Sequence, residues 1–482
     1  MPTENKEDYR KKESRDLLTS IKRVRDFVQG SDKVKAEGVE YLPKPIESGN
    51  IIYDNKRYKA YVKRACFFNA TGNTLDNLLG ELFRVEPRVE LKPPLEFLAE
   101  NVDGGGNDLQ TFLKTLAGEV IQTGLTGILV DYPFVDREKV ISIKDKEDLG
   151  LTPQLKTIKR EDIINWNYNV KDNRKQLEFL VIREDYTDPK DRYSENTIKR
   201  LREFEIVNGQ VVTRVKESES ASQLSEAANY SKTLEAVIVG LDGKPLKEIP
   251  FIAVGSKHNC IENNPLPLGA IAILNESHYR NSADDEESSF MVGQPTPVIK
   301  HISEDWFNRV LGGKLNLGAR TAIPLEHESS DVTLLQAEPN TMPLTRMQHK
   351  EEQMRMLGAS LVMEKGGNTT ATEKVLDASS ELSVLANISV NISKGVNDAL
   401  KFAILFTGGE VAKDTILEIN QDFDAGIFDN NQVSSIQTAY RNELISRPET
   451  RDLLRKAGWK LQDDDSALED IKKDNNEEGE IE

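Results

Sequence analysis

The stretch Leu268–Ile299, LGAIAILNESHYRNSADDEESSFMVGQPTPVI, constrains this chain more than any other part of its sequence. The apolar run Ile271–Leu274 leads into polar residues without Gly or Pro until Gly293, which predicts a helix of about six turns. Apolar residues are sparse after that run, and Asp284–Glu287 place four carboxylates in a row. A helix that is polar nearly all round is either solvated or packed against copies of itself. The stretch therefore predicts an architectural rod, which ends where the GQPTPV segment cannot continue a helix.

Two more helical segments follow this rod. The first, Leu344–Met363, carries methionine and leucine on one face and charged residues elsewhere. The segment Lys365–Thr370 contains two glycines and predicts a break. The second helix is expected over Thr372–Phe406, where small and apolar residues recur at steps of three and four and predict a packing seam. The seam positions are Val375, Ala378, Leu382, Leu385, Ser389, Ile392, Val396, Ala399 and Ala403.

The N-terminal part of the chain shows helical periodicity. One helix is predicted over Ser14–Gln29, and two more over Arg57–Phe83 with a break near Thr71–Asn73. Asp108 is the expected N-cap of a further helix, which runs to Thr123. Together these segments predict a helical body.

From residue 128 to residue 255 the pattern changes to that of β-strands. Asn208-Gly209 lies between two β-prone runs and predicts a hairpin, as does Asp242-Gly243. The Ser- and Glu-rich segment Lys216–Ser231 predicts a mobile loop. We therefore expect a mixed sheet on the helical body, which makes the chain an α+β protein.

Residues 291–342 are expected to form a compact β-rich insertion between two helices. The predicted strands of this insertion are Thr296–His301, Leu311–Ala322 and Val332–Leu335. After the seam helix, residues 415–428 predict one more strand, and a helical pair is expected before the acidic C-terminal segment.

Composition limits the functions that are open. The chain has 482 residues and a net charge of −18, and it contains no apolar run long enough to span a membrane. The charged N-terminus predicts no signal peptide. Two cysteines, Cys66 and Cys260, argue for a reducing compartment and against a disulfide scaffold. The acidic balance excludes a broad basic DNA-binding face, and suits either ordinary solubility or a surface past which DNA must slide.

The motifs of common catalytic sites are absent from the sequence. Leu311–Leu315 has a Gly-Lys pair but lacks the spacing of a phosphate loop, so it predicts a turn. The five histidines form no HExxH motif, and Gly-x-Ser-x-Gly is missing. On a helix Asp284 and Glu287 share a face and could hold Mg²⁺ in a nuclease, but a solvated or inter-subunit face is favoured. We expect no catalytic residue, no cofactor and no metal.

Several phrases taken together resemble a known family. They are YVKRACFFNATGNTLDNLLGELFR, DLQTFLKTLAGEVIQTGLTGILVDYP, IINWNY, LNESHYRNSADDEESSFMVGQPTP and TATEKVLDASSELSVLANIS. With a helix, a β-rich insertion, a second helix, a Gly/Asn/Thr loop and a seam helix in this order, the chain resembles the tailed-bacteriophage portal proteins. More closely, it is similar to a portal-like family of phages and prophages often described only as a domain of unknown function. The resemblance spans roughly residues 15–425.

The resemblance implies a portal fold with a helical wing and mixed β-sheet, a two-helix stem, a small β-rich clip, a long connecting helix and a helical crown. In chain order these segments are the wing 1–265 with its β-rich part 128–255, the first stem helix 266–290, the clip 291–342, the second stem helix 343–363, the tunnel loop 364–371, the long helix and return to the wing 372–428, the crown 429–462 and a disordered acidic tail 463–482.

The resemblance also implies a function. A ring of twelve subunits would form a channel at one capsid vertex of the virion, through which double-stranded DNA is packaged and ejected. Such a ring is assembled in the cytoplasm of the host bacterium and involves no membrane and no enzymatic activity of its own. Its expected partners are the terminase large subunit, the major capsid and scaffolding proteins, and the neck or tail adaptor.

Three groups of residues carry these roles by resemblance. The tunnel loop at the DNA channel would be Lys365, Gly366, Gly367, Asn368, Thr369 and Thr370. The stem face toward the lumen or a neighbouring subunit would carry Asp284, Asp285, Glu286, Glu287, Arg346 and Lys350. Docking on the clip would use Trp306, Phe307, Arg309, Lys314 and Arg320.

Two other functions remain open at this point. One is a different structural virion protein, such as an adaptor or a minor capsid protein, although adaptors are usually shorter and lack a helix–insertion–helix core. The other is a metal-dependent nuclease that uses Asp284 and Glu287, although the sequence places no His or Lys beside them. Chain length and the interrupted helix pair favour the portal.

Overall fold

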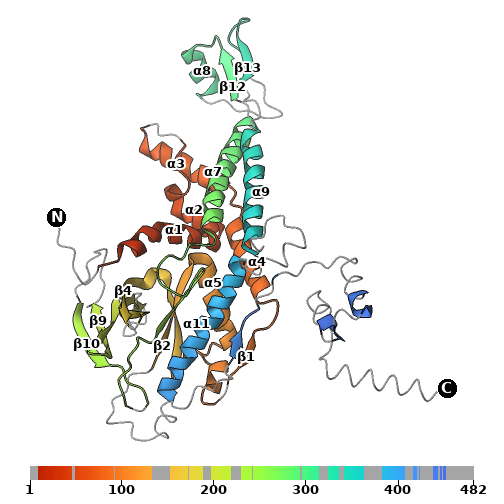
Figure 1. Ribbon diagram of the computed structural model, residues 1–482. Helices are drawn as coiled ribbons and strands as arrows, with labels where there is room; N and C mark the ends of the chain where they lie inside the picture. The colour runs from red at the N-terminus through yellow and green to blue at the C-terminus, as the bar shows by residue number, and fades with distance from the viewer. Residues whose placement is uncertain are drawn as a thin grey trace.

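A computed structural model shows a body of helices and sheets from which one long helix pair extends to a small end unit (Figure 1). The structure describes residues 9–45, 49–91, 93–132, 152–171, 173–187, 197–218, 230–241, 243–293, 296–313, 324–335, 341–362, 383–407, 416–420, 423, 438–442, 446–447 and 449–451.

The N-terminal part of the body is helical, as predicted. The helix α1 buries Ile21, Val24 and Phe27, which recur at helical spacing on one face. Asp108 caps α5 by accepting a hydrogen bond from the Thr111 backbone N–H, which confirms the predicted cap. The elements are α1 (Lys12–Gln29), α2 (Ser31–Glu37), η2 (Gly38–Glu40), α3 (Ile51–Arg64), α4 (Ala70–Leu82), η3 (Glu96–Ala99) and α5 (Leu109–Thr123).

The break between α3 and α4 lies earlier than predicted. Helix α3 ends at Arg64 and α4 begins at Ala70, so the prediction of a break near Thr71–Asn73 was wrong. Asn69 is the N-cap of α4, and its side chain accepts a hydrogen bond from the Gly72 backbone N–H. Turn-forming residues are typical of a first helical turn, because its N–H groups need partners outside the helix.

The strands that the structure describes form two main sheets and three two-stranded pairs. The larger sheet has the order β10-β9-β8-β5-β4, the smaller one has the order β11-β2-β3, and the pairs are β1–β14, β12–β13 and β6–β7. The bounds are β1 (Arg88–Glu90), β2 (Leu125–Asp131), β3 (Gln154–Lys159), η4 (Arg160–Asp162), β4 (Ile163–Lys171), β5 (Arg174–Arg183), β6 (Tyr186–Thr187), β7 (Thr197–Ile198), β8 (Arg200–Val207), β9 (Gln210–Ser218), β10 (Tyr230–Val237), β11 (Phe251–Gly255), β12 (Thr296–Lys300), β13 (Asp331–Leu335) and β14 (Ile416–Glu418).

Every pair of described strands is antiparallel, so the prediction of a mixed sheet was wrong. Short connections join β4 to β5 and β8 to β9 in the larger sheet, and a two-residue hairpin can only join antiparallel strands. The predicted turn at Asn208-Gly209 is confirmed, because both residues have positive φ (52° and 76°) between β8 and β9. The predicted loop Lys216–Ser231 is shorter than expected: β9 extends to Ser218 and β10 starts at Tyr230, with residues 219–229 outside the described part.

The helix α11 (Val384–Thr407) forms the centre of the main core, packed against β11, β2 and α5. The predicted seam is confirmed over the described part of this helix. The first three seam positions, Val375, Ala378 and Leu382, lie outside the described residues. The buried seam residues are Leu385, Ser389, Ile392, Val396, Ala399 and Ala403. Beyond this helix, the predicted strand in residues 415–428 is present as β14, which pairs with β1.

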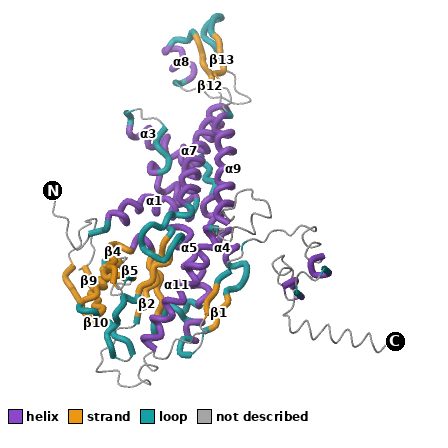
Figure 2. Tube along the Cα trace, in the orientation of Figure 1, coloured by secondary structure: helices purple, strands orange, loops and turns teal. Residues whose placement is uncertain are grey.

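The helices α7 (Gly269–Val292) and α9 (Met342–Val362) run side by side away from the body (Figures 1 and 2). Both were predicted from the sequence within three residues of these bounds. At their far end lies a small unit made of β12, β13 and a helix, α8 (Glu304–Leu311). The sequence pattern had predicted only strands in this unit. A second, smaller core joins α7 to the first helices of the chain through Tyr279 and Ala283, which pack with Phe27 and Tyr61.

Candidate functional site

The α7–α9 pair connects the body to the end unit, and α7 buries polar as well as apolar side chains. Asn275, His278 and Ser282 of α7 are each at most 5% exposed. Burying a polar side chain is unfavourable unless it finds hydrogen-bond partners, so such residues specify one packing arrangement. The contacts of Asn275 and His278 show how the pair is held.

Asn275 attaches the base of α7 to the start of α4. Its Oδ1 accepts hydrogen bonds from the backbone N–H and the hydroxyl of Thr71, and its Nδ2 donates to the Phe68 carbonyl. No sequence motif indicated this contact, because the two partners are far apart in the chain.

His278 and Lys350 attach α9 to α7. The His278 Nε2 lies 3.1 Å from Glu351 Oε1, and the Lys350 ammonium donates to the Ser277 carbonyl at 2.9 Å. Burial, with the nearby Arg346 and Arg280 guanidinium groups, lowers the pKa of Lys350. Lys350, expected on the stem surface, therefore lies between the two helices, whereas Arg346 is exposed.

The acidic run Asp284–Glu287 lies beside α3 of the same chain. Asp284 accepts a hydrogen bond from the Tyr61 hydroxyl at 2.8 Å, and Glu287 pairs with Arg64. Glu286 accepts from the thiol of Cys66, and this hydrogen bond together with burial raises the pKa of Cys66. The sequence did not indicate these intramolecular partners.

The outer faces of the pair expose large apolar side chains. Ile273 of α7 is 55% exposed and Met356 of α9 is 62% exposed. Single exposed apolar residues are ordinary, but their recurrence along the α7–α9 pair, called the rod below, indicates a surface that another protein covers. The other exposed apolar residues of these two helices are Phe290, Met291, Met342 and Leu344.

The end unit contains only part of the expected docking group. Trp306 of α8 is buried, so its side chain belongs to the interior of this unit, which corrects the expectation that it is available for docking. Phe307 is half-buried and Arg309 is exposed. Lys314 and Arg320 lie outside the described residues.

Helix α8 has clear end signals. Ser303 caps its first turn through the Trp306 backbone N–H, and Gly312 ends it in the left-handed conformation. The first residues of the predicted turn, Leu311 to Gly313, are thus the end of a helix and its cap, and Lys314 lies outside the described residues.

Other predicted features fall outside what the structure describes. The tunnel-loop residues Lys365–Thr370 lie outside it, as does most of the predicted crown and tail. Among the described residues, no three or more His, Cys, Asp or Glu side chains are placed to hold a metal ion. None of the described helices is both long and apolar enough to cross a membrane.

Comparison with known proteins identifies one matching family model. The model, described as "Domain of unknown function (DUF4055)", matches residues 267–407. This region starts just before α7 and ends with the last residue of α11, so it contains the helix pair, the end unit and the seam helix. No curated protein matches the chain.

The solved structures with a similar chain include structures of gene transfer agent particles. A chain of "Virion of native gene transfer agent (GTA) particle" has 13% identity and a TM-score of 0.40, covering 82% of this chain and 92% of that chain. A chain of "Neck of native GTA particle computed with C12 symmetry" has 13% identity and a TM-score of 0.38, with 80% and 89% covered. A chain of "Neck of empty GTA particle computed with C6 symmetry" has 13% identity and a TM-score of 0.38, with 84% and 93% covered.

Proposed function

We propose that this chain is the subunit of a portal ring in a phage-like virion, a channel for packaging and ejecting double-stranded DNA at one capsid vertex. The observation that carries the proposal is the α7–α9 pair. It is fixed to the body by buried polar contacts, and it exposes apolar side chains along its outer faces.

A ring of subunits would supply a partner surface that covers these exposed apolar side chains. In a closed ring each subunit presents one face to the neighbour on one side and a different face to the neighbour on the other. Ile273 and Met356 lie on different helices of the rod, so one subunit offers an apolar contact from each helix. Covering such side chains contributes roughly 25 cal/mol for each Å² of apolar surface removed from water. The rods would then line the central channel together.

The parts of a portal follow from this arrangement as proposals. The body to residue 265 would be the wing, α7 and α9 the stem, and residues 291–342 the clip that binds the terminase motor and later the neck or tail adaptor. Lys365–Thr370 would be the tunnel loop at the DNA, and residues 429–462 the crown. The acidic balance of the chain (net charge −18) suits a channel that does not retain the phosphate backbone.

The experiment is negative-stain electron microscopy and mass photometry of the purified chain. The expected result is rings of twelve subunits, each ring with a central channel. Ile273→Asp, and separately Met356→Asp, should shift the population to monomers, because each places a charge in a covered apolar contact.

Leu234→Asp is the matched control. Leu234 is 56% exposed on β10 in the body, away from the rod, so this variant should still form rings. The proposal fails if the unmodified chain stays monomeric under all assembly conditions, or if all three variants assemble equally well.

A further inference from the structure

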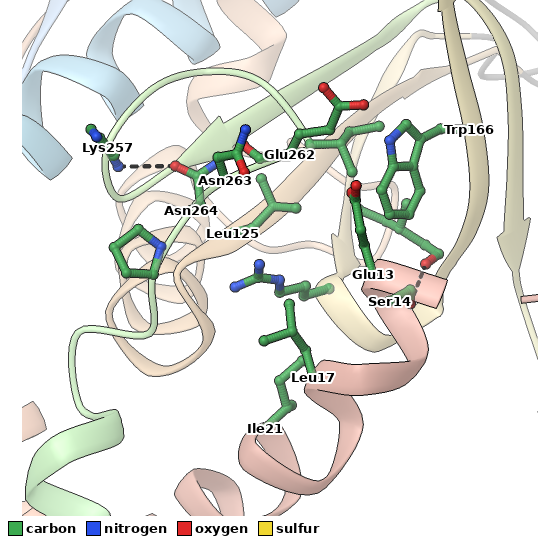
Figure 3. Close-up of a pocket in the computed structure, with 14 residues that line it drawn as sticks. Glu13, Ser14, Leu17, Ile21, Leu125, Trp166, Lys257, Glu262, Asn263 and Asn264 are labelled. Atoms are coloured by element: carbon green, nitrogen blue, oxygen red, sulfur yellow. Dashed lines mark hydrogen bonds between the residues drawn. The ribbon is translucent and has the colours of Figure 1, made fainter. Parts of the chain in front are cut away.

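A cavity of about 580 Å³ lies between α1, the start of β4 and the loop of residues 256–265 (Figure 3). Leu17 and Ile21 of α1 line one side, Leu125 of β2 lies across from them near Asn264, and Trp166 of β4 lies near Glu13. This volume accommodates a small organic molecule or a protein side chain with its neighbours. The portal proposal assigns no role to it.

One buried cation, Arg160, lines this cavity. Arg160 is only 7% exposed, and its Nη1 donates a hydrogen bond to the Thr123 carbonyl at the end of α5. Among the described residues, no carboxylate lies within ion-pair distance of Arg160: Glu161 pairs with Arg25 at 2.6 Å, and Glu262 pairs with Lys175 at 2.7 Å. A guanidinium has five N–H donors, so most of its hydrogen-bonding capacity faces no protein acceptor.

The charge of Arg160 persists at neutral pH. Burial lowers the pKa of its guanidinium to about 10, and Glu161 opposes this change. At the rim, Glu13 and Lys257 are both exposed and have opposite charges. Glu262 also lines the cavity, but it pairs with Lys175 and Lys11, so among the described residues the interior charge without an ion-pair partner is that of Arg160. A buried positive charge without a counter-charge is unfavourable.

The loop on one side of the cavity is held in a defined shape. The Asn264 Oδ1 accepts a hydrogen bond from the Lys257 backbone N–H at 3.0 Å (Figure 3). It accepts another from the His258 backbone N–H at 3.2 Å. Its Nδ2 donates to the Cys260 carbonyl at 2.6 Å. Because Asn264 is only 3% exposed, these bonds lie within the protein, and the cavity wall is preorganised for a ligand.

From this geometry we infer that the cavity binds a carboxylate attached to an apolar group. The carboxylate would accept two parallel hydrogen bonds from Arg160, the favoured geometry of this pair. The apolar part would lie against Leu17, Ile21 and Trp166. Two sources supply this chemistry: a small organic acid, or an acidic side chain from a second copy of this chain.

A purely structural role for Arg160 makes a different prediction. If Arg160 only caps the carboxyl end of α5, a single donor is sufficient, and Lys would replace it without loss. A carboxylate ligand instead needs the planar two-donor arrangement, which Lys lacks.

The test is a titration of the full chain with 3-phenylpropionate, compared with the uncharged 3-phenylpropanol. In a Trp306→Phe/Trp459→Phe background, the emission of Trp166 reports binding at the cavity. The acid should bind at least about tenfold more tightly than the alcohol, and Arg160→Gln and Arg160→Lys should each remove that preference. Arg355→Gln, on the exposed surface of α9, should retain it.

The oligomeric state in which the acid binds distinguishes the two sources of the carboxylate. Binding to both monomers and assembled chains supports a small acid, and binding only to monomers supports a carboxylate of a neighbouring copy that occupies the site on assembly. Equal binding of acid and alcohol, no binding in either state, or full binding by Arg160→Lys overturns the proposal. Without ligand, the melting temperature of Arg160→Gln should equal or exceed that of the original chain; should this variant not fold, Arg160→Lys gives the comparison.

Discussion

Thr71 and Asn275 are both fully buried and hydrogen-bonded to each other, although 204 residues separate them. The backbone N–H and the hydroxyl of Thr71 donate to Asn275 Oδ1 at 3.1 and 2.9 Å, and Asn275 Nδ2 donates to the Phe68 carbonyl at 2.8 Å. A single amide therefore satisfies three polar groups at the start of α4, where a helix has unpaired N–H groups. It fixes the position at which the α7–α9 rod leaves the body.

Replacing Asn275 with Ala should be strongly destabilising. It leaves the N–H and hydroxyl of Thr71 and the carbonyl of Phe68 buried without a partner, and each such group costs roughly 1–3 kcal/mol. We expect the free energy of unfolding, measured by urea denaturation, to fall by roughly 3 kcal/mol or more.

Asn281→Ala on the same helix is the control for this prediction. Asn281 is half-buried and makes no side-chain hydrogen bond among the described residues, so its loss should change stability by less than about 0.5 kcal/mol. A similar effect of both variants would show that Asn275 does not hold the rod to the body.

Gly395 of α11 should resist replacement by Ala, although Ala is the better helix former. A Cβ at this position would lie 2.6 Å from Val254 Cγ2 on β11, closer than two carbon atoms can pack. Overpacking of this kind costs roughly 1–3 kcal/mol and outweighs the gain of about 1 kcal/mol in helix propensity. We expect Gly395→Ala to lower the free energy of unfolding, and Val254→Ala to relieve part of that loss when the two are combined.

Gly358→Ala on α9 should instead raise the free energy of unfolding. Its Cβ would meet only the Thr74 side chain, with Cγ2 at 3.5 Å and Oγ1 at 3.8 Å. These are ordinary contacts, so the helix-propensity gain of roughly 0.5–1 kcal/mol remains. If both substitutions shift stability in the same direction, close packing of α11 on β11 is not what requires glycine at 395.

Local sequence signals located most helices of the fold. The α7 segment was predictable because an uninterrupted helical stretch ends in Gly and Pro, and the α11 seam because its period is regular over many turns. Helix α8 was also signalled, by Ser303 as N-cap and Gly312 as the end, but the glycine-interrupted residues around it suggested strands. Strand direction was predictable where a hairpin turn was signalled, as at Asn208-Gly209 between β8 and β9. For strands joined by longer connections it was not predictable, because the pattern of one strand does not define its neighbour.

The long-range contacts of the candidate site could not be predicted in the same way. The contacts of Asp284 with Tyr61 and of Asn275 with Thr71 join segments more than 200 residues apart, and neither residue pair has a local signature. In the sequence, Arg160 is one charged residue between two strands, and no local pattern marks it as buried. Only the fold shows that it is buried beside a cavity.

Asp131 should stabilise the contact between the two main sheets in a pH-dependent manner. Its carboxylate on β2 lies 2.7 Å from Lys156 Nζ on β3 and 3.2 Å from Arg202 Nη1 on β8. Burial alone would raise the pKa of Asp131, but Arg202 and Lys156 outweigh it and lower the pKa below the ordinary value. A lowered folded-state pKa means that this stabilisation is present above about pH 4 and is lost as the pH falls through the folded-state pKa.

Asp131→Asn should therefore reduce the free energy of unfolding by roughly 1.5–3 kcal/mol at pH 7, and by less below about pH 4. The measurement is urea unfolding at pH 7 and pH 3. Asp16→Asn, at an exposed position of α1 without an ion pair among the described residues, should show neither effect. A difference between Asp131→Asn and the original chain that is independent of pH would rule out the ion pairs as its cause.

The contact between Tyr61 and Asp284 predicts that the acidic run of α7 is held by α3 within one chain. The Tyr61 hydroxyl donates to Asp284 Oδ1 at 2.8 Å, and burial together with this hydrogen bond raises the pKa of Tyr61. A double-mutant cycle of Tyr61→Phe and Asp284→Ala on the monomer should give a coupling energy of about 1 kcal/mol. The same cycle with Asp285→Ala should couple by less than about 0.5 kcal/mol, because Asp285 has no partner among the described residues. Coupling for Asp284 that appears only in assembled rings would instead place its partner on a neighbouring subunit.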